Sequence, residues 1–350
     1  MQGNTKTKMA KKNLKVLDLF CGCGGLSLGF EQAGFEISLG IDNWEESLKT
    51  FKNNHKNSEV LCADLSKVKP QEINGKFDVI IGGPPCQGFS ISGKRNPNDP
   101  RNKLYQSFVS FVEYFKPKAF IMENVPNLVA MNNGKVKDQI IKEFEALGYK
   151  VVYKILLTSD FGVPQNRKRV VFVGLQNGKS FTFPEGKYKD NKITAFEAIS
   201  DLPENEIKDG TLYPHFPKSE YQKMIRENSI KIFNHETTKH TEKTVEIISL
   251  VPDGGNYKDL PKNLQNTRKV NIAWTRLNSK KPSFTIDTGH NHHFHYKFNR
   301  VPTVRESARI QSFPDTFIFC GKKNDQLKQV GNAVPPILGK VIGKNLLKLL

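Results

Sequence analysis

One cysteine stands in a segment whose neighbours either stiffen or free the backbone. The run GGPPCQGFS, residues 82–90, directly follows the apolar stretch 77–81 and places Cys86 just beyond a predicted buried strand. Two prolines restrict the chain before the cysteine, and residues past a strand end lie where α/β folds present their chemistry. A generic cysteine is a small buried apolar residue, but the flanking Gly and Pro disfavour a core position. We therefore interpret Cys86 as a functional residue.

Charged groups are expected at the same edge of the sheet. The apolar stretch 119–122 ends in Glu123, and the run QNRKRV, residues 165–170, brings Arg167 and Arg169 to the start of another strand. Directly after the Cys86 segment, residues 91–102 are polar and basic and show no apolar periodicity. Such a segment predicts a loop able to close over a nucleic-acid substrate.

A glycine-rich turn near the N-terminus predicts a ligand site. The run VLDLFCGCGGL, residues 16–26, reads as strand, turn and helix, and its glycines allow close backbone approach to a ligand. A nicotinamide fingerprint starting at Gly22 fails because its third glycine position is Ser27. Asp42 and Asp64 follow the next two strands, where carboxylates can accept ribose hydroxyls and an exocyclic amine. An aspartate in this place is more often a turn former, yet an adenosine ligand without diphosphate fits S-adenosylmethionine.

These side chains require an alternating scaffold. Strands are predicted at residues 15–20, 36–41, 59–62, 77–81, 119–122, 150–156 and 169–174, and helices at 26–33, 45–53, 104–115 and 136–146. This alternation is typical of a doubly wound α/β fold with a covered parallel sheet. From about residue 179 to 300 the chain is loop-rich, and helical patterns return with Thr303 as an N-cap for 304–311 and a last helix over 336–350.

The charge of the chain indicates which class of partner it binds. Lys and Arg number 53 against 35 Asp and Glu, a formal charge of +18, so nucleic acid is the natural partner, with a merely solvated basic surface as the alternative.

Five cysteines without a CxxC pair argue against a disulfide framework or structural metal. Four histidines within residues 290–295 lack a further ligand set, so we interpret them as polar loop residues near the nucleic acid and expect no metal. No apolar run approaches the ~20 residues that span a bilayer, and the basic N-terminus does not resemble a secretory leader, so we expect an intracellular protein.

The motifs together resemble the C5-cytosine-specific DNA methyltransferases of bacterial restriction-modification systems. DLFCGCGG, GPPCQGFS, ENV, QNRKRV and QVGNAVPP occur in the order that the family shows, over about residues 14–175 and 300–350. The resemblance implies an S-adenosylmethionine-dependent, Rossmann-like methyltransferase domain over 1–185 and a smaller, loop-rich target-recognition domain over 186–300. A small-domain or hinge segment over 301–328 and a C-terminal helix over 329–350 would then return the chain to the first domain.

The resemblance also assigns roles to individual residues. Cys86 is expected to be the nucleophile, with Glu123, Arg167 and Arg169 completing catalysis. The expected cofactor contacts are Phe20, Gly22, Gly25, Leu26, Asp42, Asp64, Leu65, Pro84, Asn332 and Val334. The expected DNA contacts are Gln87, Ser90, Lys94, Arg95, Arg101, Arg268 and Arg276.

The implied reaction is methylation of C5 of a cytosine flipped out of a specific short duplex sequence, through a covalent bond between Cys86 and C6. The implied partners are double-stranded DNA and a cognate restriction endonuclease acting on the same site, and we expect a cytoplasmic monomer associated with the nucleoid. Two alternatives remain: a tRNA cytosine methyltransferase, which resembles the same motif set, and a catalytically silent DNA-binding relative. The long divergent region favours DNA, and the presence of Cys86 and Glu123 disfavours a silent relative.

Overall fold

The chain is built around one mixed sheet. The computed structural model describes residues 14–85, 103–266, 274–289 and 292–350. Its seven-stranded sheet has the order β3-β2-β1-β4-β5-β7-β6. The strands are β1 (Lys15–Leu19), β2 (Glu36–Asp42), β3 (Glu59–Cys62), β4 (Val79–Gly82), β5 (Ala119–Asn124), β6 (Lys150–Leu157) and β7 (Lys168–Leu175). The predicted α/β class and all seven predicted strands are confirmed, with ends shifted by one or two residues.

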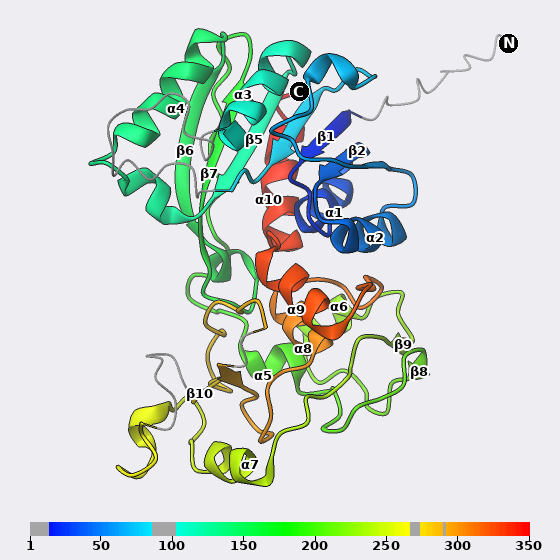
Figure 1. Cartoon of the computed structure of the whole chain (residues 1–350), viewed down its shortest axis with the longest axis vertical. Coiled ribbons are helices and arrows are strands. Elements are labelled where there is room, and N and C mark those ends of the chain that lie inside the picture. The colour runs from blue at the N-terminus through cyan, green and yellow to red at the C-terminus, as the bar shows by residue number, and fades with distance from the viewer. Residues whose placement is uncertain (1–13, 86–102, 267–273, 290–291) are drawn as a thin grey trace, which may run out of the picture.

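Successive residues of the central strands serve opposite faces of the sheet. Val16 packs with the helices α1 (Gly25–Ala33), α2 (Glu45–Asn54) and α10 (Pro336–Leu347), whereas Leu17 packs with α3 (Lys103–Phe115) and α4 (Lys135–Ala146). Strand side chains alternate in direction, so a run apolar at every position has to be covered on both sides. Figure 1 shows the sheet between these two layers of helices.

One strand departs from the predicted parallel arrangement. β7 is antiparallel to both β5 and β6, while the other paired strands of the sheet are parallel. The connection from β6 to β7 holds only the short 3-10 helix η4 (Thr158–Phe161) and a loop. Because a parallel neighbour needs a longer crossover, this short connection turns the chain back antiparallel.

Residues 179–300 are poor in regular structure, as expected, and helices return over 304–332. Together these two stretches contain the helices α5 (Ala195–Ile199), α6 (Glu220–Ile225), α7 (Glu242–Ser249), α8 (Val304–Ile310) and α9 (Lys323–Asn332), with the two-residue strands β8 (Thr211–Leu212), β9 (Lys231–Ile232), β10 (Thr275–Arg276) and β11 (His293–Phe294). Thr303 caps α8 as predicted, because its hydroxyl accepts the Glu306 N–H at 3.2 Å. These elements lie below the sheet in Figure 1.

The C-terminal end of the chain lies against the helices that cover the sheet. Helix α10 packs along α1, and a Cβ added at Gly29 would lie 2.5 Å from the Pro336 carbonyl oxygen. The motif at 329–336 does not simply open a helix, however. Residues up to Asn332 finish α9, and α10 begins only at Pro336. The tandem prolines cause this break, since proline lacks an N–H and disfavours helical backbone in the preceding residue.

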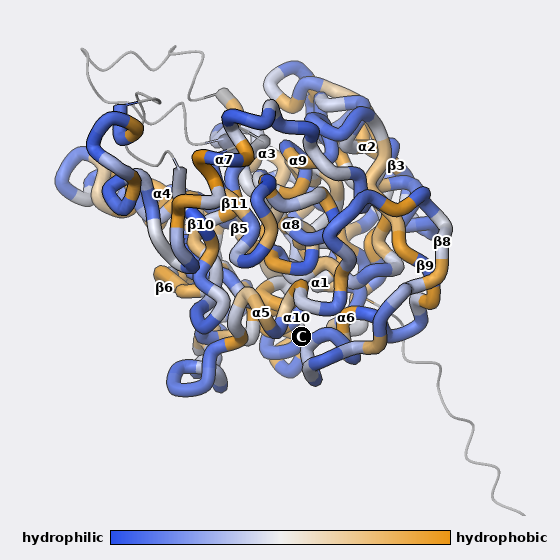
Figure 2. Tube along the Cα trace, turned by 90° about the horizontal axis from the view of Figure 1, so that it is seen from below, coloured by the Kyte–Doolittle hydropathy of each residue, from blue (hydrophilic) through white to orange (hydrophobic). Residues whose placement is uncertain are grey.

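Hydropathy follows this layering. Figure 2 shows hydrophobic stretches in the inner elements, such as α1 and α10, and hydrophilic residues along most outer loops. Within the described segments, each helix is too short or too polar to cross a membrane.

Candidate active site

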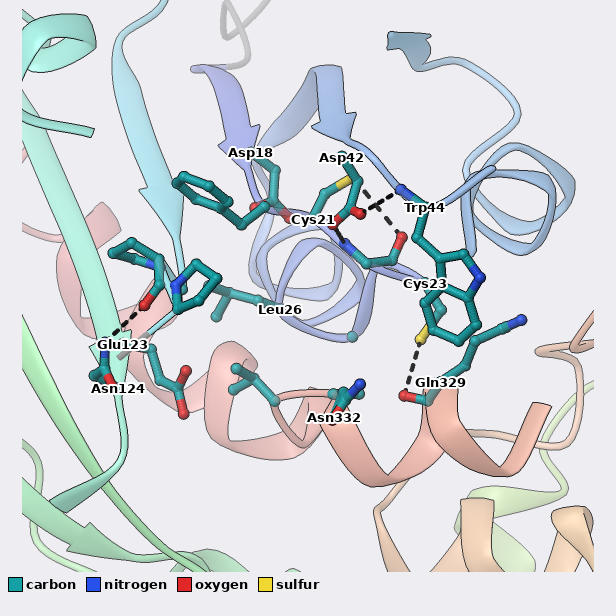
Figure 3. A pocket seen from close by; sticks show the side chains of 18 of the residues that line it. Asp18, Cys21, Cys23, Leu26, Asp42, Trp44, Glu123, Asn124, Gln329 and Asn332 are labelled. Carbon is teal, nitrogen blue, oxygen red and sulfur yellow. Dashed lines mark hydrogen bonds between the residues drawn. The ribbon is translucent and has the colours of Figure 1, made fainter. Parts of the chain in front are cut away.

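A cavity of about 660 Å³ opens at the carboxyl ends of the parallel strands. Each of the first five strands contributes at its end: Phe20 after β1, Asp42 in β2, Asp64 after β3, Pro84 after β4 and Glu123 in β5. Residues 331–334 close the wall from the opposite side, and Figure 3 shows Asn332 facing this space together with Asp42 and Glu123. The strand order reverses between β1 and β4, and such a point is where open α/β sheets bind ligands.

The glycine-rich turn forms one wall through its backbone. Phe20, Gly22 and Gly24 have φ angles of 61°, 53° and 93°, in the left-handed region that favours glycine. A Cβ at Gly22 would meet no atom within 4 Å, whereas one at Gly25 would lie 2.4 Å from the Val334 carbonyl oxygen. Gly22 therefore leaves room inside the cavity, and Gly25 allows the C-terminal segment to pack against the turn.

Asp42 is held by the backbone around it. The Gly22 N–H donates to its Oδ2 at 2.8 Å and the Trp44 N–H to its Oδ1 at 2.9 Å. Burial raises the pKa of Asp42, while these backbone donors act in the opposite direction. Asp64 is more exposed, and hydrogen bonds from the Ser66 hydroxyl and N–H lower its pKa. Each carboxylate thus has a fixed orientation at the cavity.

A buried carboxylate and two arginines form the other end. Antiparallel pairing sets Glu123 opposite Val171, two residues from Arg169 in β7, so the Arg169 Nε lies 2.6 Å from the Glu123 Oε1. Arg167 is buried, and its Nη2 donates to the Gly331 carbonyl oxygen at 2.8 Å. Burial raises the pKa of Glu123, although Arg169 and Arg167 oppose the shift. The neutral form of Glu123 is favoured relative to an exposed glutamate.

The chain approaches Cys86 along the cavity wall. Pro84 and Pro85 both line the cavity, and the Asn124 side-chain amide donates to the Pro84 carbonyl oxygen at 2.8 Å. A Cβ at Gly82 would lie 2.2 Å from the Leu19 carbonyl oxygen, so β4 can end beside β1 only with glycine there. The predicted site residues Cys86, Gln87, Ser90, Lys94, Arg95, Arg101 and Arg268 lie outside the described residues.

The remaining predicted cofactor and catalytic residues converge on this one cavity. Its lining includes Phe20, Gly22, Gly25, Leu26, Asp42, Asp64, Leu65, Pro84, Glu123, Arg167, Arg169, Asn332 and Val334. These residues are separated by more than three hundred positions in the sequence, and the strand ends and residues 331–334 bring them together.

Arg276, predicted to contact DNA, has a different place. Its side chain is 4 % exposed, and Nε donates to the Val251 carbonyl oxygen at 2.7 Å. The four remaining donors bond Ile248, His295, Phe298 and Asn299. A guanidinium has five donors, so Arg276 retains none for a base or phosphate, and the prediction is wrong.

The histidine-rich segment also differs from the prediction in part. His295 is buried and stacks on Phe298 with ring centroids 4.4 Å apart, so it packs inside the molecule and is not a polar loop residue near DNA. In the part of the chain that the structure describes, no three His, Cys, Asp or Glu side chains gather as a metal site.

Sequence reasoning missed several residues of the cavity. Trp44 lies two positions after Asp42, and the Lys328 Nζ lies 4.6 Å from its ring centroid. The position of Trp44 beside a strand end was the available clue. Thr285 and Ile286 come from the loop-rich region, two and three residues after Ser283, which pairs with Gln165. No local pattern marks this long-range contact.

Comparisons with known proteins agree with this geometry. The family model for C-5 cytosine-specific DNA methylases matches residues 14–348. The type II methyltransferase M1.HphI of Haemophilus parahaemolyticus is 41 % identical, over 96 % of this chain and 87 % of its own length. The type II methyltransferase M.DdeI of Desulfomicrobium norvegicum is 37 % identical, over 95 % and 88 %.

A solved structure of a DNA methyltransferase also resembles this chain. The crystal structure of a prophage-encoded E. coli protein, described as that of a DNA modification methyltransferase, superposes with a TM-score of 0.79 at 26 % identity and covers 96 % of this chain and 99 % of that one. The chain therefore belongs to the family of C-5 cytosine-specific DNA methylases and is a DNA cytosine-5-methyltransferase.

Proposed function

We propose that the enzyme transfers a methyl group from S-adenosylmethionine to C5 of a cytosine flipped out of a short, specific duplex DNA sequence, through a covalent bond between Cys86 and C6. The observation that carries this proposal is the shared cavity. Asp42 and the glycine turn lie in the same space as Glu123, Arg169 and the two prolines that lead to Cys86. S-adenosylmethionine and a cytosine bound in this cavity would lie next to each other.

The cavity fits S-adenosylmethionine in size and chemistry. Its volume of about 660 Å³ is in the usual range for ligands of this size. Asp42 and Asp64 would accept hydrogen bonds from the ribose hydroxyls and the adenine amine, and the open space at Gly22 would admit the ligand close to the backbone. Phe20, Leu26, Leu65, Pro84 and Val334 would cover the apolar parts of the ligand, with Gly25 and Asn332 beside them. Bound S-adenosylmethionine supplies an electrophilic methyl group.

The residues at the other end would activate the base. Cytosine C5 is a weak nucleophile, so the Cys86 thiolate would first add to C6 and convert the ring into an enamine. Glu123 would hold the N3 and amine edge and, in its neutral form, donate a proton to N3 as electrons move into the ring. Arg169 would hold O2, with Arg167 behind it. After methylation, loss of the C5 proton allows Cys86 to leave and restores the aromatic ring.

The remaining chain would recognise DNA. We propose a catalytic and cofactor-binding domain over 1–185, a target-recognition domain over 186–300, a hinge segment over 301–328 and a returning segment over 329–350. Gln87, Ser90, Lys94, Arg95, Arg101 and Arg268 would contact DNA, with the basic residues chiefly on phosphates. We expect a monomer acting on nucleoid DNA in the cytoplasm, and relatives named type II methyltransferases suggest a paired restriction endonuclease.

A covalent trap tests the proposed function. Bisulfite sequencing of DNA from cells expressing the enzyme should first reveal one methylated sequence. A duplex with 5-fluorocytosine at that position should then form an adduct that survives denaturing electrophoresis when S-adenosylmethionine is present. Fluorine cannot leave C5 as a cation, so elimination of the thiolate is blocked. Equal assays on tRNA would reveal the alternative substrate.

Two variants make this trap specific. Cys86→Ser should abolish the adduct because a hydroxyl ionises far less readily than a thiol. Cys62→Ser is the matched control, since Cys62 is an exposed cysteine outside the cavity, and it should leave the adduct intact. Burial raises the pKa of Cys21 and of Cys23, the latter to about 12, which disfavours either thiol as the nucleophile. A peptide map placing the base on another cysteine would contradict the assignment.

A further inference from the structure

Two buried glutamines join the loop-rich region to the cofactor wall of the cavity. Gln165 and Gln311 have fully buried side chains, and the Gln165 Nε2 donates to the Gln311 Oε1. The Gln165 Oε1 accepts the Ile286 N–H at 3.0 Å, and the Gln311 Nε2 donates to the Ala333 carbonyl oxygen at 2.5 Å. The two amides thus form a continuous chain of hydrogen bonds from Ile286 to Ala333.

Both ends of this series of hydrogen bonds lie at the cavity wall. Ile286 and Ala333 line it, and Arg167 follows Gln165 by two residues and bonds the Gly331 carbonyl oxygen. On one side, the backbone of Ser283 bonds Pro164 and Asn166 at 2.9 and 2.7 Å. On the other side, residues 333 and 334 pack directly on the glycine turn, where a Cβ at Gly25 would find no room.

The contact between the two segments is too tight to absorb a displacement locally. A Cβ at Gly331 would lie 2.4 Å from the Asp287 carbonyl oxygen, so the backbones of 286–287 and 331–333 are closely packed. A buried amide that loses its partner also costs free energy. Movement of 283–286 must therefore either break the amide chain or move residues 331–334 with it.

We propose that Gln165 and Gln311 are positioning residues that couple DNA binding to cofactor binding. This inference rests on the proposed function. DNA held against Thr285 and Ile286 would fix the amide chain and hold residues 331–334 in the arrangement that the cofactor needs. Because coupling is reciprocal, bound cofactor would tighten DNA binding by the same factor.

The test compares cofactor affinity with and without DNA. The probes are S-adenosylhomocysteine, which cannot donate a methyl group, and a duplex carrying the sequence found by bisulfite sequencing. For the wild-type enzyme, calorimetry should show a dissociation constant about tenfold lower in the presence of the duplex, a factor typical of coupled sites. In Gln311→Met the ratio of the dissociation constants without and with the duplex should fall to near one, because methionine offers no hydrogen-bond partner for Gln165 or Ala333.

A matched control separates coupling from stability. Gln222 is equally buried, but its amide bonds Phe196 and Ser200, away from the cavity. Gln222→Met should lower the denaturation midpoint as Gln311→Met does, yet keep the wild-type ratio. If both variants lose the ratio equally, or Gln311→Met keeps it, the inference is overturned.

A second variant tests the hydrogen bond from residue 311 to the Ala333 carbonyl oxygen. It does not require the fold to accept methionine at position 311. In Gln311→Glu, a protonated carboxyl can still donate to the Ala333 oxygen, whereas the carboxylate cannot. Burial raises the pKa of a glutamate, so the residue at 311 should be protonated at about pH 6 and ionised at about pH 9. The ratio of dissociation constants should therefore equal that of wild type at about pH 6 and fall to near one at about pH 9, with wild type measured at each pH. A ratio that follows wild type throughout would contradict the coupling. Absence of any methylated sequence would instead contradict the proposed function.

Discussion

At the scale of the residue, the two aspartates that follow strands differ in how firmly they are held. Asp42 receives N–H donors from both Gly22 and Trp44, which fixes both of its oxygens. Asp64 is held mainly by the neighbouring Ser66 and is more exposed. A carboxylate already oriented loses less freedom when it binds a ligand, so Asp42 should contribute more to cofactor affinity.

We expect Asp42→Ala to weaken S-adenosylhomocysteine binding about tenfold to a hundredfold, because a charged hydrogen bond contributes roughly 1.5 to 3 kcal/mol. DNA affinity measured without cofactor should remain nearly unchanged. Calorimetric titration measures the first and fluorescence anisotropy of a labelled duplex the second. Asp138→Ala, at an aspartate on α4 outside the cavity, is the control and should change neither. Unchanged cofactor affinity in Asp42→Ala would remove Asp42 from the site.

At the scale of the element, the contact between α1 and α10 depends on small residues. A Cβ at Gly29 would lie 2.5 Å from the Pro336 carbonyl oxygen and 2.6 Å from the Lys340 backbone nitrogen. A Cβ at Gly343 would lie 2.8 Å from the Ala33 Cβ. These neighbours are mostly backbone atoms, which cannot rotate away as a side chain could. The approach of the two helices also sets the distance between the glycine turn and residues 331–334.

Gly29→Ala should therefore destabilise the protein, although alanine is the better helix former by about 1 kcal/mol. Overpacking of this kind costs typically 1 to 3 kcal/mol, which urea denaturation would show as a lower midpoint. Gln32→Ala lies on the exposed side of the same helix and should shift the free energy of unfolding by less than about 0.5 kcal/mol. Equal midpoints for Gly29→Ala and wild type would show that the helices can separate freely.

At the scale of the whole molecule, part of the loop-rich region has a core of its own. Ile247, Ile248, Val251, Leu260, Trp274, Phe294 and Val301 form one cluster, separate from those around the sheet. Arg276 ties the same stretch together, because its five hydrogen-bond acceptors all lie within residues 248–299. The contacts from Ser283 and Ile286 to the 164–166 segment use their backbone groups, which any sequence supplies.

Exchange of residues 242–301 for the matching segment of a relative should thus give a folded enzyme that methylates a different sequence. Bisulfite sequencing reads the new specificity. Calorimetry without DNA should find cofactor affinity within about threefold of wild type, because residues 283 and 286 hold the 164–166 segment through backbone groups. The wild-type segment reinserted into the relative is the reciprocal control. A chimera that keeps the original methylated sequence would show that recognition lies elsewhere in the chain.

The sequence alone determined the scaffold and most of the cavity. Continuous apolar runs need cover on both faces, so the seven strands and their helices follow from local pattern. Asp42, Asp64 and Glu123 could be placed at one edge because each follows a strand, and parallel strands end on the same side. The glycine turn was recognisable for the same reason, since it joins the first strand to its helix.

The tertiary structure decided what depends on contacts between distant segments. A basic residue in a loop-rich region suggested a DNA contact at Arg276, but five acceptors from distant positions bury it. The insertion of β7 between β5 and β6, antiparallel to both, depends on pairing with β5, and the pairing of Ser283 with Gln165 joins segments more than a hundred residues apart. Local sequence patterns indicate which secondary structure a segment forms and which way its side chains point. The residues that a side chain contacts depend on the tertiary fold of the whole chain.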